Sequence, residues 1–258
     1  MSWQEFSGGS VYLPPQEIVG IVHFLGGAFV ATAPQLSYRS FLEQIGEAGF
    51  AIVATPFLNT FNHLTIAKEV LNHFENICDR LQAMDALGKR YLPIYGIGHS
   101  MGCKLHLLIG SLFHVERAGN ILISFNNYPA ARAIPFGEQI PVTEALDLEF
   151  TPSPEETKNL IIQDYKIARN LLIKFRNDTI DQTNNLQSIL QKSFPNTIVL
   201  RTLKGNHLTP LSQDFEWDAG DVFSPFDAIA QWLKQGLSGE LMSLRSEVLM
   251  WLNPVFYM

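Results

Sequence analysis

Short apolar runs recur along the chain and alternate with longer segments whose apolar residues have helical spacing. Uninterrupted apolar runs suit parallel strands buried on both faces, and the longer segments suit helices that cross between them. The predicted strands cover residues 18–24, 50–55, 92–97, 120–125, 171–175 and 197–201. The predicted helices cover residues 41–49, 66–87, 103–109, 154–168, 182–191 and 225–236. This alternation predicts an α/β fold, with a mostly parallel central sheet flanked by helices.

Two regions depart from the alternation. Residues 3–6 and 10–13 are separated by Gly8 and Gly9, which predicts a small leading hairpin. Residues 126–170 are rich in proline at first and become helical from Pro154. We therefore expect one domain over residues 1–258, with residues 126–170 as a short cap insertion within it.

Composition narrows the class of protein. The chain has 258 residues, of which 47% are hydrophobic and 17% charged, as suits one globular domain with a buried core. The net charge is −7 and no cluster of Lys and Arg forms a basic stripe, so nucleic-acid binding is disfavoured. The two cysteines, Cys78 and Cys103, favour neither a disulfide framework nor a multi-cysteine metal site. We expect no metal and no other cofactor.

The chain ends differ in character. Residues 1–5 contain no basic region followed by an apolar core, and no apolar stretch approaches the roughly 20 residues of a spanning helix. A cytoplasmic protein is predicted. Residues 248–258 are unusually apolar for a terminus. Packing on the core is favoured for this tail, and the alternative is peripheral contact with a membrane surface or a partner. The sequence leaves the oligomeric state open.

A motif of the form G-x-S-x-G covers residues 98–102, directly after a predicted strand and directly before a predicted helix. In that setting the serine lies on a tight, strained turn that exposes its hydroxyl at the end of the sheet. The flanking glycines, Gly98 and Gly102, let the strand and the helix pass close to each other. Ser100 is therefore predicted to be a nucleophile.

The same glycines also resemble a dinucleotide-binding fingerprint. That fingerprint belongs at the first strand of its unit, whereas here two strand–helix units precede it. The next strand should end in an acidic residue that binds ribose, yet residues 120–125 lead into Asn126 and Asn127. The hydrolase interpretation is favoured over the dinucleotide one.

A serine nucleophile needs a base and an acid that orients the base. His207 lies in a polar loop after the last of the six predicted strands, where an imidazole reaches back over the sheet edge. The acid is expected between Ser100 and His207 in chain order. Asp178 is favoured because it is the first carboxylate after the strand at residues 171–175. Asp181 is the second choice, since it is suited instead to capping the following helix.

An oxyanion hole requires two donors aimed at the developing negative charge. We expect one from the backbone N–H of Met101, the residue after the nucleophile. The other is expected from the glycine turn after the strand at residues 18–24, at Gly27 or Ala28, because glycine lets the backbone approach a substrate closely.

With these pieces in order, the chain resembles the α/β-hydrolase superfamily over nearly its full length. More narrowly, it resembles a family of unknown function from cyanobacteria and plant plastids, on residues 22–30, 33–39, 98–102, 119–122 and 169–175. The superfamily resemblance implies a triad of Ser100, Asp178 and His207, whereas the narrower one implies no substrate. In many relatives the histidine follows a glycine directly, but here Asn206 separates Gly205 from His207.

The favoured function is that of a serine hydrolase acting on a carboxylic ester, a thioester or a lipid acyl group. The alternative is a non-catalytic protein of the same fold that binds a small molecule, a membrane or a protein partner. A retained acid, base and nucleophile favour the hydrolase. The sequence does not indicate which acyl group is bound.

Overall fold

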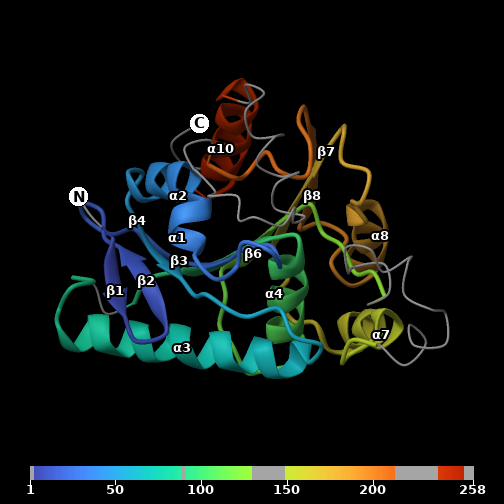
Figure 1. The fold of residues 1–258 in the computed structure, drawn as a ribbon, viewed down its shortest axis with the longest axis horizontal. Helices are drawn as coiled ribbons and strands as arrows, with labels where there is room; N and C mark the ends of the chain where they lie inside the picture. Colours follow the sequence, from blue (N-terminus) through green and yellow to red (C-terminus); the bar gives the residue numbers. More distant parts are fainter. Residues whose placement is uncertain (1–2, 89–90, 130–148, 213–237, 253–258) are drawn as a thin grey trace, which may run out of the picture.

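The computed structural model describes residues 3–88, 91–129, 149–212 and 238–252, and it contains one mixed sheet with helices on both faces (Figure 1). The strand order is β1-β2-β4-β3-β5-β6-β7-β8. The pairs β1–β2 and β2–β4 are antiparallel, and the other neighbouring pairs are parallel. The strands are β1 (Gln4–Phe6), β2 (Gly9–Tyr12), β3 (Gly20–Leu25), β4 (Phe50–Ala54), β5 (Ile94–His99), β6 (Gly119–Ile123), β7 (Asn170–Phe175) and β8 (Ile198–Leu203). The predicted mostly parallel sheet flanked by helices is confirmed.

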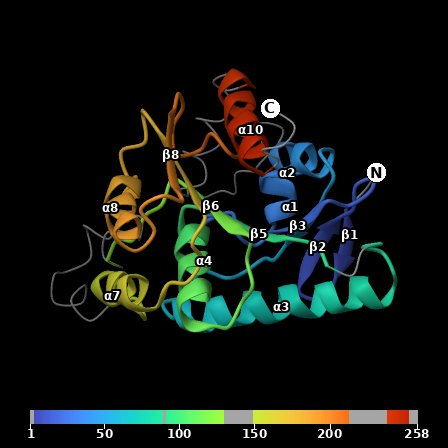
Figure 2. The same ribbon diagram turned by 180° about the vertical axis from the view of Figure 1, so that it is seen from behind.

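The helices form a layer on each side of this sheet (Figures 1 and 2). One layer holds α1 (Pro34–Ser37), α2 (Arg39–Gly46) and α10 (Ser238–Leu252). The other holds α3 (His63–Ala83), α4 (Met101–Leu112), α7 (Pro154–Asp164) and α8 (Thr183–Ser193). Successive residues of a strand face opposite layers, as β6 illustrates. Ile121 and Ile123 pack with α2 and α10, whereas Leu122 packs with α4, α7 and α8. This two-sided burial explains why the strands are continuous apolar runs.

Helix boundaries depend on local capping. Helix α3 begins before Ile66, because the Asn62 side chain accepts the Thr65 N–H and so satisfies a free donor of the first turn. Helix α7 begins with a capping box in which Ser153 and Glu156 exchange side-chain and backbone hydrogen bonds. The short helix α1 has no counterpart among the predicted elements.

Three sequence predictions concern segments that are described only in part or not at all. Much of the predicted cap insertion, at residues 130–148, and the predicted helix at residues 225–236 lie outside the described residues. The described part of the apolar tail is in α10, where Val248 and Leu252 are buried in the core beside the sheet. Residues 253–258 lie outside the description. Among the helices that are described, none has the length and apolar character needed to cross a membrane.

The contact between β3 and the first turn of α4 has no room for a side chain. A Cβ atom on Gly102 would overlap the backbone carbonyl of Leu25 and come within 2.9 Å of the Gly26 carbonyl oxygen. Backbone atoms cannot move aside as a flexible side chain can, so the helix or the strand would have to shift.

We predict that Gly102→Ala lowers the free energy of unfolding by about 1–3 kcal/mol, which is the usual cost of overpacking a close contact. Gly239→Ala is the matched control, because a Cβ on that helical residue would meet nothing within 4 Å. The control should leave stability unchanged or raise it slightly, since alanine favours a helix over glycine. Urea unfolding of both variants tests the difference, and equal stability of the two would contradict the close contact.

Candidate active site

Ser100 lies on a strained turn between β5 and α4. Its φ of +54° is in the left-handed region, which is unusual for a residue with a side chain. The Ser100 N–H donates to the Ile123 carbonyl oxygen at 2.9 Å, which ties the turn to the neighbouring strand β6. A Cβ on Gly98 would lie 2.6 Å from the Cys103 nitrogen, so the strand and the helix require glycine here. This is the elbow geometry that the motif predicts.

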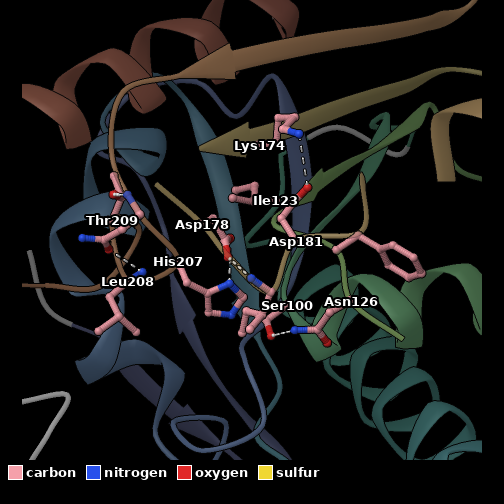
Figure 3. A network of polar contacts seen from close by, with 12 residues as sticks. Ser100, Ile123, Asn126, Lys174, Asp178, Asp181, His207, Leu208 and Thr209 are labelled. Atoms are coloured by element: carbon pink, nitrogen blue, oxygen red, sulfur yellow. Dashed lines mark hydrogen bonds and ion pairs between the residues drawn. The ribbon is translucent and has the colours of Figure 1, made fainter. Parts of the chain in front are cut away.

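The imidazole of His207 is hydrogen bonded to a buried carboxylate. His207 Nδ1 lies 2.8 Å from Asp178 Oδ2, in a contact that joins the loops after β8 and β7. The Asp178 side chain is fully buried, whereas the His207 side chain is 19% exposed. Figure 3 shows the His207 ring between Asp178 and Ser100. Because Nδ1 faces the carboxylate, Nε2 is the ring nitrogen available to a substrate or a nucleophile.

Asp178 is held in its charged form by its neighbours. Burial alone would raise its pKa, but the hydrogen bond and the charge of His207, the Ser124 hydroxyl and the Ile180 N–H together lower it below the usual value. The Ile180 N–H donates to Asp178 Oδ1 at 3.1 Å. The carboxylate is therefore poised to stabilise an imidazolium.

Asp181, the alternative acid, has a different role. Its two carboxylate oxygens accept hydrogen bonds from the N–H and the hydroxyl of Thr183, at the start of α8. Lys174 Nζ lies 3.9 Å from Asp181 Oδ1 (Figure 3). Burial raises the pKa of Asp181, in the opposite direction from Asp178. The structure thus brings Asp178 to the imidazole and directs Asp181 toward Thr183 at the start of α8.

The additional residue before His207 has a local function. Gly205 has a φ of +124°, and the Asn206 N–H that follows donates to Thr209 Oγ1 at 2.9 Å. The Asn206 side chain accepts the Leu208 N–H at 2.9 Å. Asn206 thus closes a compact turn around His207, so its insertion after the glycine is compatible with the contact to Asp178.

Asn126 is a site residue that the sequence analysis did not identify. Its side-chain amide donates to Ser100 Oγ at 3.0 Å (Figure 3). The loop is fixed on both sides of it, because Gln182 N–H donates to the Phe125 carbonyl and Asn127 N–H donates to the Gln182 side chain. Among the contacts of the described residues, no hydrogen bond joins Ser100 Oγ to His207. Only the position of Asn126 after a strand end was visible in the sequence.

The glycine turn after β3 differs from expectation in one respect. The Gly27 N–H donates to the Tyr38 hydroxyl at 2.7 Å, so it is already engaged within the protein. The N–H groups of Ala28 and Met101 have no acceptor within the part of the chain that the structure describes. Of the three predicted oxyanion-hole residues, Gly27 is therefore unsuited in this structure, and Ala28 and Met101 remain the candidates.

A buried lysine lies on α4, one turn after Ser100. Lys104 is 2% exposed, and its ammonium donates to the Pro152 carbonyl at 3.1 Å and faces the Phe150 ring. The His63 ring stacks on the same Phe150 ring, and the two ring centroids are 4.3 Å apart. Burial lowers the pKa of Lys104 to about 7 and that of His63 to about 3. Within the part of the chain that is described, no group of His, Cys, Asp and Glu is arranged to hold a metal ion.

Comparisons with known proteins agree with this architecture. The family described as "Protein of unknown function (DUF1350)" matches residues 2–254. No curated protein is significantly similar to the chain.

Several solved structures share the fold at low identity. The fluorophosphonate-binding serine hydrolase F of Staphylococcus aureus is 14% identical, with a TM-score of 0.56 over 90% of this chain and 91% of that one. Carboxyl esterase 2 of Tuber melanosporum is 16% identical, with a TM-score of 0.56 over 78% and 72% of the two chains. The Pyrococcus furiosus esterase Pf2001 is 19% identical, with a TM-score of 0.53 over 78% and 77%. At these identities the likeness establishes the α/β-hydrolase fold.

The buried amine of Lys104 predicts a pH-dependent stability. Burial lowers the pKa of Lys104 from 10.5, the value for an exposed lysine of the unfolded chain, to about 7 in the folded chain. Between these pH values the unfolded chain binds a proton that the folded chain lacks. The stability contribution of Lys104 therefore rises with pH across this window and is least favourable below pH 7. We predict that Lys104→Met is more stable than the parent at pH 6 and that this advantage shrinks by pH 10.

Urea unfolding at pH 6, 8 and 10 measures this effect. Lys68→Met, at an exposed position of α3, is the matched control and should show no such trend. A Lys104→Met difference that is constant over the three pH values would contradict the prediction.

Proposed function

This chain belongs to the family described as "Protein of unknown function (DUF1350)", and we propose that it is a serine hydrolase that transfers the acyl group of an ester or thioester to water. The observation that carries the proposal is the contact of 2.8 Å between His207 Nδ1 and the buried Asp178 carboxylate, beside a serine on a strained elbow. A loop histidine fixed in this way serves as a base, whereas a merely exposed histidine needs no buried acid.

In the first half of the proposed reaction, His207 Nε2 accepts the hydroxyl proton of Ser100 while Oγ attacks the substrate carbonyl carbon. The carbonyl oxygen becomes an oxyanion, for which the N–H groups of Met101 and Ala28 are the proposed donors. The tetrahedral intermediate then expels the alcohol or thiol, which takes its proton from the His207 imidazolium. An acyl group remains as an ester on Ser100 Oγ.

In the second half, a water molecule replaces the leaving group. His207 accepts a proton from this water, and the resulting hydroxide attacks the acyl carbon. The second tetrahedral intermediate expels Ser100 Oγ, which regains its proton from His207, and the carboxylic acid departs. Asp178 remains ionised throughout and stabilises the imidazolium that forms in each half. Its lowered pKa supports this role.

Asn126 gives the resting serine a defined orientation. Its amide donates to Ser100 Oγ, so the serine keeps its own proton free for donation to His207 when a substrate enters. Hydrogen bonds of this kind are often absent from unliganded sites and form only in the substrate complex. The Asn126 contact is thus compatible with a reactive serine.

The substrate is proposed to carry an apolar acyl chain, as in medium-chain or lipid acyl esters. Exposed apolar side chains follow the carboxyl ends of three parallel strands, which is where ligands bind in such sheets: Phe29 after β3, Leu58 and Phe61 after β4, and Ile180 after β7. The Phe57 N–H donates to the Ala31 carbonyl, which joins the first two of these loops. Phe57 also packs with Met101, beside the nucleophile.

A fluorophosphonate probe tests the proposed nucleophile. We expect the folded parent to be labelled and Ser100→Ala to be unlabelled, because phosphonylation requires an activated serine. Ser188→Ala, at an exposed position of α8, should label like the parent. Folded parent protein that resists the probe over pH 6–9 would contradict the proposed function.

The same assay separates the two carboxylates. Asp178→Asn should slow labelling by about 10³–10⁴-fold, since loss of the orienting acid has costs of this order in triad enzymes. Asp181→Asn should remain within about tenfold of the parent, because that carboxylate contacts Thr183 and Lys174 instead of the imidazole. Equal rates for the two variants would exclude Asp178 as the triad acid.

Ester chain length tests the proposed substrate class. We expect kcat/KM for p-nitrophenyl hexanoate to exceed that for the acetate by at least about tenfold, because each buried methylene contributes about 0.8 kcal/mol. Leu58→Ser should reduce this ratio, since Leu58 is 72% exposed in the loop after β4. Met84→Ser is the control, at an exposed apolar residue after the far end of α3. An unchanged ratio in Leu58→Ser would remove Leu58 from the acyl site.

A further inference from the structure

A chain of three hydrogen bonds, of which two are buried and the third is partly buried, runs from the glycine turn to the His207 loop. The Gly27 N–H donates to the Tyr38 hydroxyl at 2.7 Å. The Tyr38 hydroxyl lies 2.8 Å from His99 Nδ1, and His99 Nε2 lies 2.9 Å from the His207 carbonyl oxygen. Tyr38 is fully buried and His99 is 2% exposed. None of these contacts involves the imidazole of His207, which is engaged by Asp178.

The chemistry of the groups fixes the direction of every bond. The His207 carbonyl only accepts, so His99 Nε2 must carry a hydrogen. Burial and the neighbouring His207 lower the pKa of His99 to about 3, so the ring is neutral and Nδ1 is an acceptor. Tyr38 therefore donates its hydrogen to Nδ1, and its oxygen accepts from Gly27. Burial raises the pKa of Tyr38 above its usual value, which keeps this hydroxyl protonated.

We propose that Tyr38 and His99 are positioning residues that hold the glycine turn and the His207 loop in the arrangement that acyl transfer requires. This inference rests on the proposed hydrolase function. The three hydrogen bonds that join Gly27, Tyr38, His99 and the His207 carbonyl form a relay. Ser100 follows His99 directly in the chain, so this relay passes beside the nucleophile without touching the reacting atoms.

The relay has a consequence at each end. At the glycine turn, the Tyr38 hydroxyl holds the Gly27 N–H, and the next N–H of the turn, that of Ala28, is left for the oxyanion. At the other end, the bond to the His207 carbonyl fixes the backbone from which the imidazole projects. A shift of about 1 Å in such a group can cost about a hundredfold in rate. The relay therefore acts on the turnover rate more than on substrate binding.

The surroundings of the relay support a fixed geometry. A Cβ on Gly27 would lie 3.3 Å from both His99 Nδ1 and the Tyr38 hydroxyl, so glycine allows the turn to approach them. A second tie joins the same elements, because Ser212 N–H donates to the Ser37 carbonyl and the Ser40 N–H donates to the Ser212 hydroxyl. The segment that carries Tyr38 is thus also hydrogen bonded to Ser212, five residues after His207 in the sequence.

Kinetics of p-nitrophenyl acetate hydrolysis test the relay. Tyr38→Phe and His99→Phe should each lower kcat by about 10–100-fold with KM changed less than threefold. The pH dependence of kcat/KM should keep the midpoint of the parent, because the base is still His207. His99→Gln retains a donor for the His207 carbonyl, so its kcat should lie closer to that of the parent than to that of His99→Phe.

Two controls distinguish positioning from a general loss of stability. Phe41→Leu removes packing from the same core and keeps all three hydrogen bonds of the relay, so it should lower the melting temperature while leaving kcat within twofold of the parent. The double variant Tyr38→Phe/His99→Phe should lose less than the product of the two single losses, since the two residues are coupled through their shared hydrogen bond. Additive losses, or a Phe41→Leu enzyme as slow as the relay variants, would overturn the proposal.

The relay and the proposed function fail in different ways. An active parent whose Tyr38→Phe and His99→Phe variants keep full kcat overturns the relay alone. A parent inert toward both the ester and the fluorophosphonate overturns the hydrolase function, and with it any role of the relay in acyl transfer. Nitrogen-15 spectra of the imidazoles provide a readout besides activity, with His99 expected as the neutral Nε2–H tautomer over pH 5–8. An Nδ1–H tautomer of His99 overturns the relay whatever the activity.

Discussion

The strained turn at Ser100 is the constraint on which the rest of the site depends. A non-glycine residue with positive φ costs on the order of 1–3 kcal/mol, and it persists only when its surroundings hold it. Here the Ser100 N–H is tied to β6, and the absence of side chains at Gly98 and Gly102 lets α4 pack against β5 and β3. Relaxing the turn would break that packing, so the fold itself keeps the serine raised above the sheet edge.

Parallel strand pairing supplies the remaining groups at the same edge. β5, β6, β7 and β8 are consecutive neighbours, so the loops that follow them meet above their carboxyl ends. These loops carry Ser100, Asn126, Asp178 and His207. The Asp178 side chain is fully buried, and its pKa is nevertheless lowered because His207 and the Ile180 N–H offset the cost of desolvation. The hydrogen-bond partners of Asp178 thus allow a charged carboxylate to occupy a buried position.

Sequence patterns predicted the parallel strands and the elbow because each is encoded locally. Continuous apolar runs mark doubly buried strands, and the glycines of residues 98–102 mark a close approach of strand and helix. The contacts that complete the site are not local. The Gly27 N–H is hydrogen bonded to Tyr38, which lies eleven residues away along the chain. Asn126, in the loop after β6, is hydrogen bonded to Ser100, in the turn after the neighbouring strand β5. Asp178 and Asp181 share one turn, so only the direction of each side chain distinguishes them.

The fold by itself does not decide between a hydrolase and a non-catalytic binding protein, because one α/β architecture supports both. The electrostatics of the β7 turn favour the hydrolase. Two carboxylates three residues apart have pKa values displaced in opposite directions, downward at Asp178 and upward at Asp181. The lowered pKa of Asp178 holds a negative charge at the carboxylate that touches the imidazole, where the proposed acyl transfer would form a positive charge. A protein that only bound a ligand at this edge would gain nothing from burying a charged acid behind a histidine.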